Sequence, residues 1–173
     1  MRIISGKYKG KKLKGYDIIG TRPTMDRVKE SLFGIIQGYI NDASVLDLFA
    51  GSASLGLEAI SNGAKRLVLV DNNIMVTKAI KENIKNFDDD ITVINTDYKK
   101  YLKETLEKFD IIFLDPPYKS GQMNKALKII EEKELLNPGG IVVCEYENIK
   151  IETNLELIRE KNYGPKKISI FRS

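Results

Sequence analysis

Histidine is absent from this 173-residue sequence, and cysteine occurs only once. Without histidine no mechanism can rest on an imidazole base, and a single cysteine excludes both a disulfide framework and a cysteine zinc cluster. Long apolar runs are missing too, because stretches such as residues 111–114 fall far short of the roughly 20 residues of a membrane helix. We therefore expect a cytoplasmic protein that uses carboxylates, backbone groups or a cofactor, with neither a membrane nor a metal as partner.

Positive charge is concentrated at the start of the chain. Residues 1–29 hold nine Lys or Arg against two acids, whereas residues 30–173 hold 19 against 22. The first residues interleave cations with glycines and Tyr8, which suits a short hairpin that presents cations to a polyanion. A solvated lysine-rich face is the alternative. The cations expected to bind are Lys7, Lys9, Lys11, Lys12, Arg22 and Arg27.

The rest of the chain alternates strand-like and helix-like segments. An amphipathic helix over residues 21–40 precedes strands near 45–49, 66–70, 91–95, 111–114 and 141–145, with helices near 55–61, 74–87, 98–107 and 123–134. Strands this continuously apolar are covered on both faces, so the pattern predicts an α/β fold with a mostly parallel sheet. Residues 137–140 are predicted to form the turn before the last of these strands.

The tail of the chain is expected to extend this sheet. Residues 155–162 and 166–171 flank a Tyr-Gly-Pro turn and predict an antiparallel hairpin, with a helix over residues 155–161 as the alternative. The length is that of one domain. We divide residues 1–173 into a basic arm (1–20), a leading helix (21–40) and an α/β core (44–173).

Residues 45–56 have the pattern of a strand, a tight turn of small residues and a helix start. Such a turn lets the backbone approach a ligand closely, although a purely structural turn is the alternative. The Gly-Lys-Ser/Thr ending of a triphosphate loop is absent, and Ala53 stands where a dinucleotide site has its second glycine. Asp47, just before the turn, would repel phosphate but suits the positive charges of S-adenosylmethionine. We therefore expect that cofactor.

Acidic residues follow three consecutive predicted strands, and these strand ends share one edge of the sheet, where ligands bind in open α/β folds. Asp71 is placed to accept both ribose hydroxyls of a cofactor, and Asp97 to reach its adenine amino group. A strand-end cap is the alternative for Asp71. The candidate cofactor residues are Asp47, Phe49, Ala50, Gly51, Ser52, Asp71, Asn72, Asp97 and Tyr98.

The run Asp115, Pro116, Pro117, Tyr118 follows the fourth predicted strand. Its prolines remove two amide donors and leave carbonyl acceptors beside the carboxylate. Together the Asp115 carboxylate and the Pro116 carbonyl can bind both hydrogens of an exocyclic amine on a base and direct its lone pair toward a donor methyl group. Tyr118 offers a stacking surface worth roughly 1 to 3 kcal/mol per base. A turn that merely ends a strand is the alternative, and Cys144, expected in the core, argues against a cysteine adduct.

The combination resembles the RsmD family, bacterial methyltransferases that modify the N2 amine of one guanine in 16S ribosomal RNA. The resemblance covers nearly the whole chain and is carried by residues 1–10, 21–33, 47–64 and 115–118. It implies a class I, Rossmann-like methyltransferase fold, S-adenosylmethionine, and ribosomal RNA within the small subunit as the substrate. It also assigns residues 115–118 to the target amine. We expect the protein to act as a monomer.

The residues by themselves leave the base open, because the Asp-Pro-Pro-Tyr run is equally typical of DNA adenine-N6 methyltransferases. Against that enzyme stands the small size, which leaves little chain for a sequence-reading domain. A binding module that kept the fold without catalysis is a further alternative. Its support is Ala53, since the family has glycine there. The extra methyl group is expected to narrow the approach to the cofactor, with a slight shift of the loop as the alternative, since alanine tolerates ordinary backbone angles.

Overall fold

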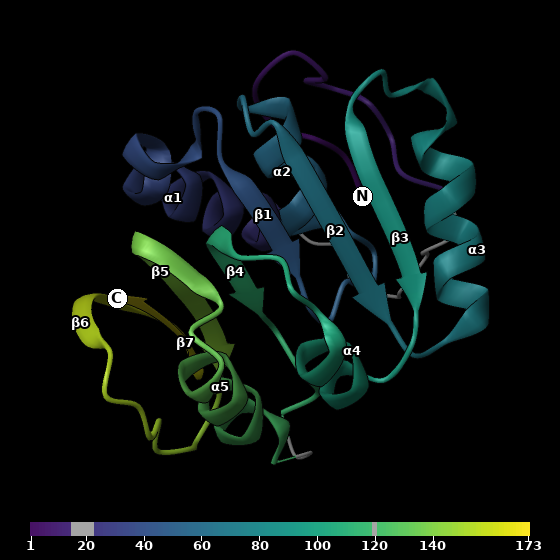
Figure 1. Ribbon diagram of the computed structural model, residues 1–173. Helices are drawn as coiled ribbons and strands as arrows, with labels where there is room; N and C mark the ends of the chain where they lie inside the picture. Colours follow the sequence, from purple (N-terminus) through teal and green to yellow (C-terminus); the bar gives the residue numbers. More distant parts are fainter. Residues whose placement is uncertain (15–22, 119–120) are drawn as a thin grey trace.

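The computed structural model describes residues 1–14, 23–118 and 121–173 (Figure 1). Its elements are α1 (Pro23–Ile40), β1 (Ser44–Asp47), α2 (Ser54–Ser61), β2 (Arg66–Asp71), α3 (Ile74–Asn83), a 3-10 turn (Ile84–Asn86), β3 (Asp90–Asn95), α4 (Tyr98–Glu104), β4 (Phe109–Leu114), α5 (Gln122–Glu132), β5 (Leu136–Tyr146), β6 (Glu156–Tyr163) and β7 (Lys166–Arg172). This order confirms the predicted alternation. Within the described ranges, no helix has the length and apolar character needed to cross a membrane.

The seven strands form one sheet in the order β3-β2-β1-β4-β5-β7-β6. Strands β1 to β5 pair in parallel, while β7 runs antiparallel to both β5 and β6. The predicted C-terminal hairpin is therefore confirmed, and the alternative helix over residues 155–161 is wrong. The strand order reverses between β1 and β4, and such a switch point opens a crevice at the carboxyl ends of the strands.

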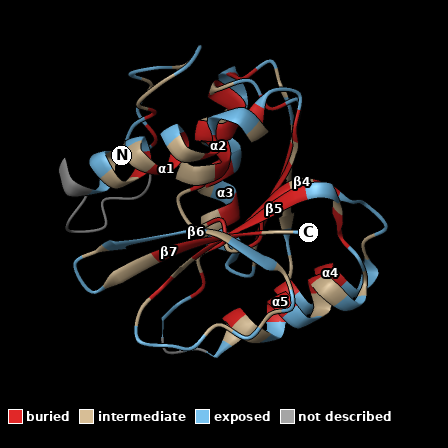
Figure 2. Cartoon of the chain, turned by 90° about the vertical axis from the view of Figure 1, so that its left-hand side faces the viewer, coloured by how far each residue is buried: buried red, intermediate tan, exposed pale blue. Residues whose placement is uncertain are grey.

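Helices cover the sheet on both sides, with α1, α2 and α3 on one face and α4 and α5 on the other (Figure 2). Neighbouring residues of one strand pack into different layers, since Val45 belongs to the first core and Leu46 to the second. Both side chains are fully buried. This two-sided burial explains why the central strands are continuously apolar rather than alternating.

The predicted turn at residues 137–140 is not a separate turn before the strand. Strand β5 begins at Leu136, opposite Phe109 of β4, and the pairing then jumps to Ile111 opposite Ile141. Residues 137–140 are therefore the irregular part of β5. Gly139 has a φ of 75°, a backbone conformation that residues other than glycine rarely adopt.

The N-terminal arm, residues 1–14, folds back on itself as a short hairpin in which Arg2 pairs antiparallel with Lys12. It is docked on α2, because the buried Glu58 accepts hydrogen bonds from the backbone amides of Ile4 and Ser5. Glu58 also pairs at 3.0 Å with Lys29 of α1. The arm, α1 and α2 thus share one buried polar link, while residues 15–22, including the predicted Arg22, lie outside the described residues.

Candidate functional site

Two cavities meet at the carboxyl edge of the sheet, at the switch point. The smaller has a volume of about 460 Å³ and the larger about 1080 Å³. Phe49, Asp115 and Tyr118 line both cavities, so a ligand in one can touch a ligand in the other. The strand-end rule correctly predicted this location, because Asp47, Asp71 and Asp115 follow or end β1, β2 and β4.

The predicted cofactor residues divide between these cavities. Those along the smaller one are Phe49, Gly51, Asp71, Asn72 and Tyr98, whereas Asp47, Phe49, Ala50 and Ser52 line the larger one. Asp97 is not among the described residues that line either cavity. Its carboxylate caps α4 by accepting from the backbone amide of Lys99 at 2.8 Å. A contact between Asp97 and adenine therefore stays a prediction.

Asp71 holds together the two turns that flank the smaller cavity. Its Oδ2 accepts from the Gly51 amide at 3.0 Å, and its Oδ1 accepts from the Asn73 amide at 2.9 Å. These two bonds fill the strand-end role, and since a carboxylate offers about four lone-pair sites, Asp71 keeps acceptor positions for a ligand. Gly51 has a φ of 53°, which lets the chain turn sharply at this point.

Asp47 is a buried carboxylate, 2% exposed, which accepts from the Gly56 amide at 3.1 Å. Burial raises its pKa from 3.8 to about 7, the Gly56 hydrogen bond opposes this rise, and the nearby charge of Asp71 adds to it. A cation in the adjoining cavity would favour the ionised form. The site is therefore suited to a ligand with positive charge.

After Asp47, the buried side chain of Tyr98 is a second indication that this site binds a ligand. Its side chain is 6% exposed and lines the smaller cavity, and its hydroxyl is buried with no hydrogen-bond partner in the described part of the chain. A buried polar group without a partner costs about 1 to 3 kcal/mol, which a ligand with a polar group can offset. The orphan hydroxyl and the Asp47 carboxylate both fit S-adenosylmethionine.

Ala53 differs from the expectation in two respects. Its φ of 61° and ψ of 17° place it in the left-handed region, which costs a residue with a Cβ roughly 1 to 2 kcal/mol, so ordinary backbone angles were the wrong expectation. Its side chain is 0% exposed and packs in the core with Leu57 and Ile60 rather than lining either cavity. The methyl group therefore does not narrow the approach to a cofactor.

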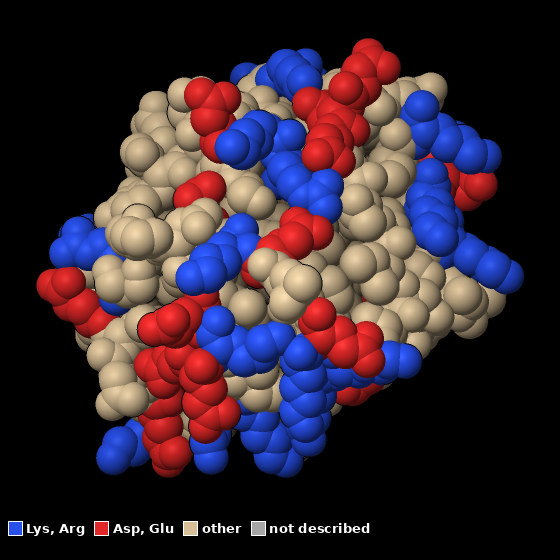
Figure 3. Space-filling model, viewed as in Figure 1, with Lys and Arg blue, Asp and Glu red and all other residues tan. Residues whose placement is uncertain are grey.

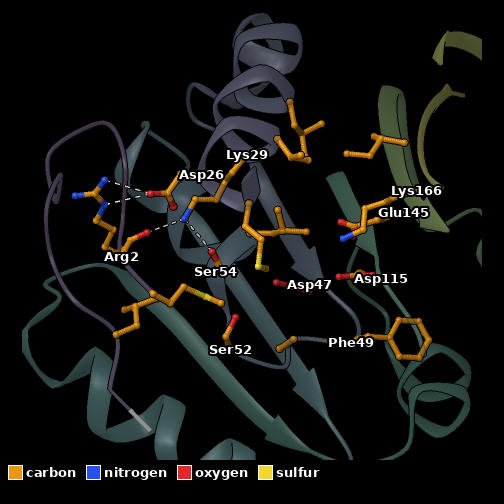
Figure 4. A pocket seen from close by; sticks show the side chains of 18 of the residues that line it. Arg2, Asp26, Lys29, Asp47, Phe49, Ser52, Ser54, Asp115, Glu145 and Lys166 are labelled. Carbon is orange, nitrogen blue, oxygen red and sulfur yellow. Dashed lines mark hydrogen bonds and ion pairs between the residues drawn. The ribbon is translucent and has the colours of Figure 1, made fainter. Parts of the chain in front are cut away.

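The larger cavity extends from Asp115 toward the N-terminal arm, α1 and the C-terminal hairpin (Figure 4). Burial raises the pKa of Asp115 well above its ordinary value, the charges of Glu145 and Asp47 add to the rise, and Lys166 opposes it. Tyr118 is 38% exposed, so its ring is available to a ligand. Pro116, in contrast, is buried.

Two residues of this cavity were missed by the sequence reasoning. Glu145 of β5 and Lys166 of β7 form an ion pair at 2.5 Å, and the Tyr118 hydroxyl lies 3.4 Å from the same Glu145 oxygen. Burial alone would lower the pKa of Lys166, but hydrogen bonding and attraction to Glu145 raise it overall. The strand-end rule could have found Glu145, whereas no local signal marks Lys166.

Comparison with known proteins decides the family. The family described as Conserved hypothetical protein 95 matches residues 1–172. The ribosomal RNA small subunit methyltransferase D of Haemophilus influenzae is 36% identical to this chain, over 95% of it and 89% of the relative. The chain belongs to this family. The resemblance to the RsmD family that the motifs indicated is thereby confirmed.

Solved structures agree with this membership. The putative methyltransferase yhhF from Escherichia coli has a solved structure that matches this chain with a TM-score of 0.90, over 99% of this chain and 97% of that one. The two sequences are 32% identical. A Thermus thermophilus 16S rRNA N2 G1207 methyltransferase, RsmC, in complex with AdoMet and guanosine, has a TM-score of 0.68 at 19% identity, over 91% of this chain and 45% of that one. At that identity the likeness concerns the fold alone, and the predicted class I methyltransferase fold is confirmed.

The Lys and Arg side chains predicted to bind nucleic acid differ in how free they are to contact a phosphate. Lys7 pairs with Asp89 at 2.6 Å, and Lys11 donates to the Asn86 carbonyl at 3.0 Å. Lys9 is exposed, as is Arg27 on α1. Lys12 lines the larger cavity. On the side of the molecule shown in Figure 3, basic and acidic side chains are interspersed.

Proposed function

We propose that this protein transfers the methyl group of S-adenosylmethionine to the exocyclic N2 amine of a guanine in small-subunit ribosomal RNA. The observation that carries the proposal is the meeting of the two cavities at Asp115 and Tyr118. The smaller one has the Gly51 turn, Asp71 and the orphan hydroxyl of Tyr98, which fit the cofactor, whereas Asp47 lies on the wall of the larger one, which can admit a base. Relatives named for ribosomal RNA small subunit methylation support the choice of polymer.

Asp115 and Pro116 are the groups proposed to bind the target amine. The delocalised lone pair of such an amine makes it a poor nucleophile, so two acceptors that hold its hydrogens direct the lone pair out of the ring. S-adenosylmethionine, held by residues of the smaller cavity, would supply an electrophilic methyl group for this amine. Transfer of that methyl group to nitrogen, with the thioether of the cofactor as the leaving group, would make the amine acidic. Asp115, with its raised pKa, is suited to receive the released proton before solvent takes it.

Alignment is the main source of rate acceleration in this scheme, and holding reactants in line is worth about 7 to 11 kcal/mol at best. Tyr118 would stack on the base, at roughly 1 to 3 kcal/mol. A paired guanine must first be turned out of its helix, at a cost of a few kcal/mol. The cavity of about 1080 Å³ that would receive such a base is lined by residues of the arm, α1 and the C-terminal hairpin.

The proposed substrate is the assembled small ribosomal subunit in the cytoplasm, approached by a single copy of the chain. The N-terminal arm supports this choice, because it brings Lys12 to the wall of the larger cavity and leaves Lys9 exposed. A cation at a cavity rim binds phosphate without reading sequence. The position of the guanine would then be selected by the shape of the particle.

The test incubates the protein with labelled S-adenosylmethionine and either small subunits, protein-free 16S RNA or duplex DNA, followed by nucleoside analysis. We expect N2-methylguanosine from the subunits and little product from the other two. N6-methyladenine from DNA would replace the proposal with the DNA enzyme. Absence of any product, with RNA binding retained, would support the non-catalytic module.

A further inference from the structure

Three charged side chains lie in order across the edge of the sheet beside the reacting site. Asp115 follows β4, Glu145 lies near the end of β5, and Lys166 begins β7. The register places Leu114 opposite Cys144, so the next residues, Asp115 and Glu145, are neighbours across β4 and β5. Strands β4, β5 and β7 are adjacent in the sheet. All three side chains line the larger cavity and appear together in Figure 4.

Glu145 and Lys166 are withdrawn from solvent without being buried. Their side chains are 12% and 27% exposed, the ion pair is 2.5 Å long, and the Lys166 nitrogen lies 5.9 Å from the centre of the Tyr118 ring. Partly desolvated ion pairs add little to stability, since desolvation offsets their attraction. A pair on a cavity wall, in contact with a residue proposed to stack on the base, is therefore better explained by ligand recognition than by folding.

The order of these groups is complementary to one edge of guanine. Along that edge guanine presents the N2 amine as a donor, then the N1 hydrogen as a donor, then O6 as an acceptor. Across the sheet the protein presents a carboxylate at Asp115, a second carboxylate at Glu145 and an ammonium at Lys166. Carboxylates accept and ammonium groups only donate, so each group of the base meets its counterpart.

Adenine would meet the same three groups badly. Beside its exocyclic amine stands N1, an acceptor, which would face the Glu145 carboxylate with lone pair against lone pair. Carbon C2 would then follow, with nothing to accept a hydrogen bond from Lys166. Sites built to hydrogen-bond a group reject analogues without it, because buried polar groups of the site then lose their partners.

We infer that Glu145 and Lys166 select guanine, the Glu145 carboxylate accepting the N1 hydrogen and the Lys166 ammonium donating to O6 while Asp115 holds the N2 amine. This inference rests on the proposed function and adds two specificity residues to it. It also supplies a structural reason for guanine rather than adenine, a choice that the Asp-Pro-Pro-Tyr run leaves open.

The experiment replaces the methylated guanine, once mapped, with 2-aminopurine by ligation of the RNA before subunit reconstitution. This base keeps the reacting amine but lacks the N1 hydrogen and O6. For the wild-type protein we expect kcat/KM to be about 100-fold or more higher on guanine, in line with hydrogen-bonding sites that reject their analogues. Glu145→Gln and Lys166→Met should each reduce this ratio by about tenfold or more, mainly through slower reaction on guanine.

Matched controls come from the same hairpin. Lys167→Met and Glu156→Gln alter the ion pairs Lys167–Glu160 and Arg172–Glu156, neither of which lines the larger cavity, so the guanine to 2-aminopurine ratio should not change. Melting temperature and cofactor affinity are measured for every variant. A ratio unchanged in both Glu145→Gln and Lys166→Met would overturn the inference.

A misfolded variant does not remove the test, since equal wild-type rates on the two bases would contradict the inference by themselves. Failure of the proposed function is distinguishable from this result. In that case the wild-type protein would form no N2-methylguanosine on unmodified subunits, whereas failure of the inference alone leaves that product intact and removes only the discrimination.

Discussion

At the scale of single residues, Asp47 and Asp115 are harder to ionise than an exposed aspartate. Both are withdrawn from water at the same edge of the sheet, and burial raises the pKa of each. Neutral carboxyl groups accept hydrogen bonds more weakly than carboxylates do. A bound cation would favour the charged form of each carboxyl group, so a ligand in one cavity affects the chemistry of the other.

Asp47 makes cofactor binding depend on pH. With a free pKa of about 7 instead of 3.8, Asp47 is protonated at pH 6, and a positive cofactor favours the ionised form. Binding at pH 6 should therefore release a proton, and affinity should rise by at most about tenfold per pH unit up to pH 7 and then level off. Calorimetry in buffers of different ionisation enthalpy measures this release. Asp47→Asn should abolish it, and an Asp47→Asn profile that still rises with pH would exclude this residue as the cause.

Asp115 is expected to contribute to the rate of methyl transfer and not to the affinity for the cofactor. Because its carboxylate is proposed to contact the target amine, Asp115→Ala should lower kcat by about 100-fold or more, the effect of removing one key polar group from a reacting site. The affinity for S-adenosylmethionine should stay within a few-fold. Single-turnover kinetics and equilibrium binding separate the two effects. The control is Asp88→Ala, an exposed aspartate, and equal loss of transfer and affinity in Asp115→Ala would contradict the proposed role.

At the scale of elements, the arm is held by close backbone contact with α2. The Lys7 amide donates to the Ser61 carbonyl at 2.9 Å, and a Cβ placed on Gly6 would lie 1.9 Å from that carbonyl oxygen. Gly10 also has a positive φ, of 85° against 76° for Gly6, but a Cβ there meets nothing within 4 Å. Substitutions at these two glycines can therefore distinguish the loss of contact with α2 from the strain of a positive φ.

Gly6→Ala should release the arm, while Gly10→Ala should leave it docked. Both substitutions impose the strain of a positive φ, but only Gly6→Ala also forces the arm away from α2. We expect faster tryptic cleavage in residues 1–14 and weaker subunit binding for Gly6→Ala alone. Limited proteolysis with mass spectrometry measures the first effect. Identical cleavage of the two variants would mean that this contact does not hold the arm.

The arm cations should contribute unequally to RNA binding. Lys7 is neutralised by Asp89, and Lys11 is engaged by Asn86, whereas Lys9 is exposed and Lys12 lines the larger cavity. Each lost phosphate contact lowers the slope of log K against log salt by about 0.7 to 0.9. Lys9→Gln with Lys12→Gln should thus flatten the slope more than Lys7→Gln with Lys11→Gln. The slopes are measured by salt titration of RNA binding. Equal slopes would favour the alternative that the arm is a solvated lysine-rich face.

At the scale of the whole molecule, the site beside the switch point between β1 and β4 combines residues of parallel strands with a residue of an antiparallel strand. The parallel strands contribute the acids at their carboxyl ends, and the antiparallel β7 contributes Lys166 at its beginning. Because β7 is inserted beside β5, its first residue lies at the same edge as the ends of the parallel strands. The C-terminal hairpin therefore completes the larger cavity as well as extending the sheet.

Periodicity and strand-end position in the sequence were enough to predict the α/β core, its order of elements and the edge that holds Asp47, Asp71 and Asp115. Those features are local, since an apolar run forms a buried strand and parallel strands end at one edge. The pairing of Lys166 with Glu145, of Lys7 with Asp89, and the left-handed backbone of Ala53 came only from the tertiary structure. The two pairings depend on which distant segment packs beside the residue, and neither composition nor spacing carries that information. The conformation of Ala53 had no signal in the sequence, because a residue with a Cβ rarely adopts left-handed angles.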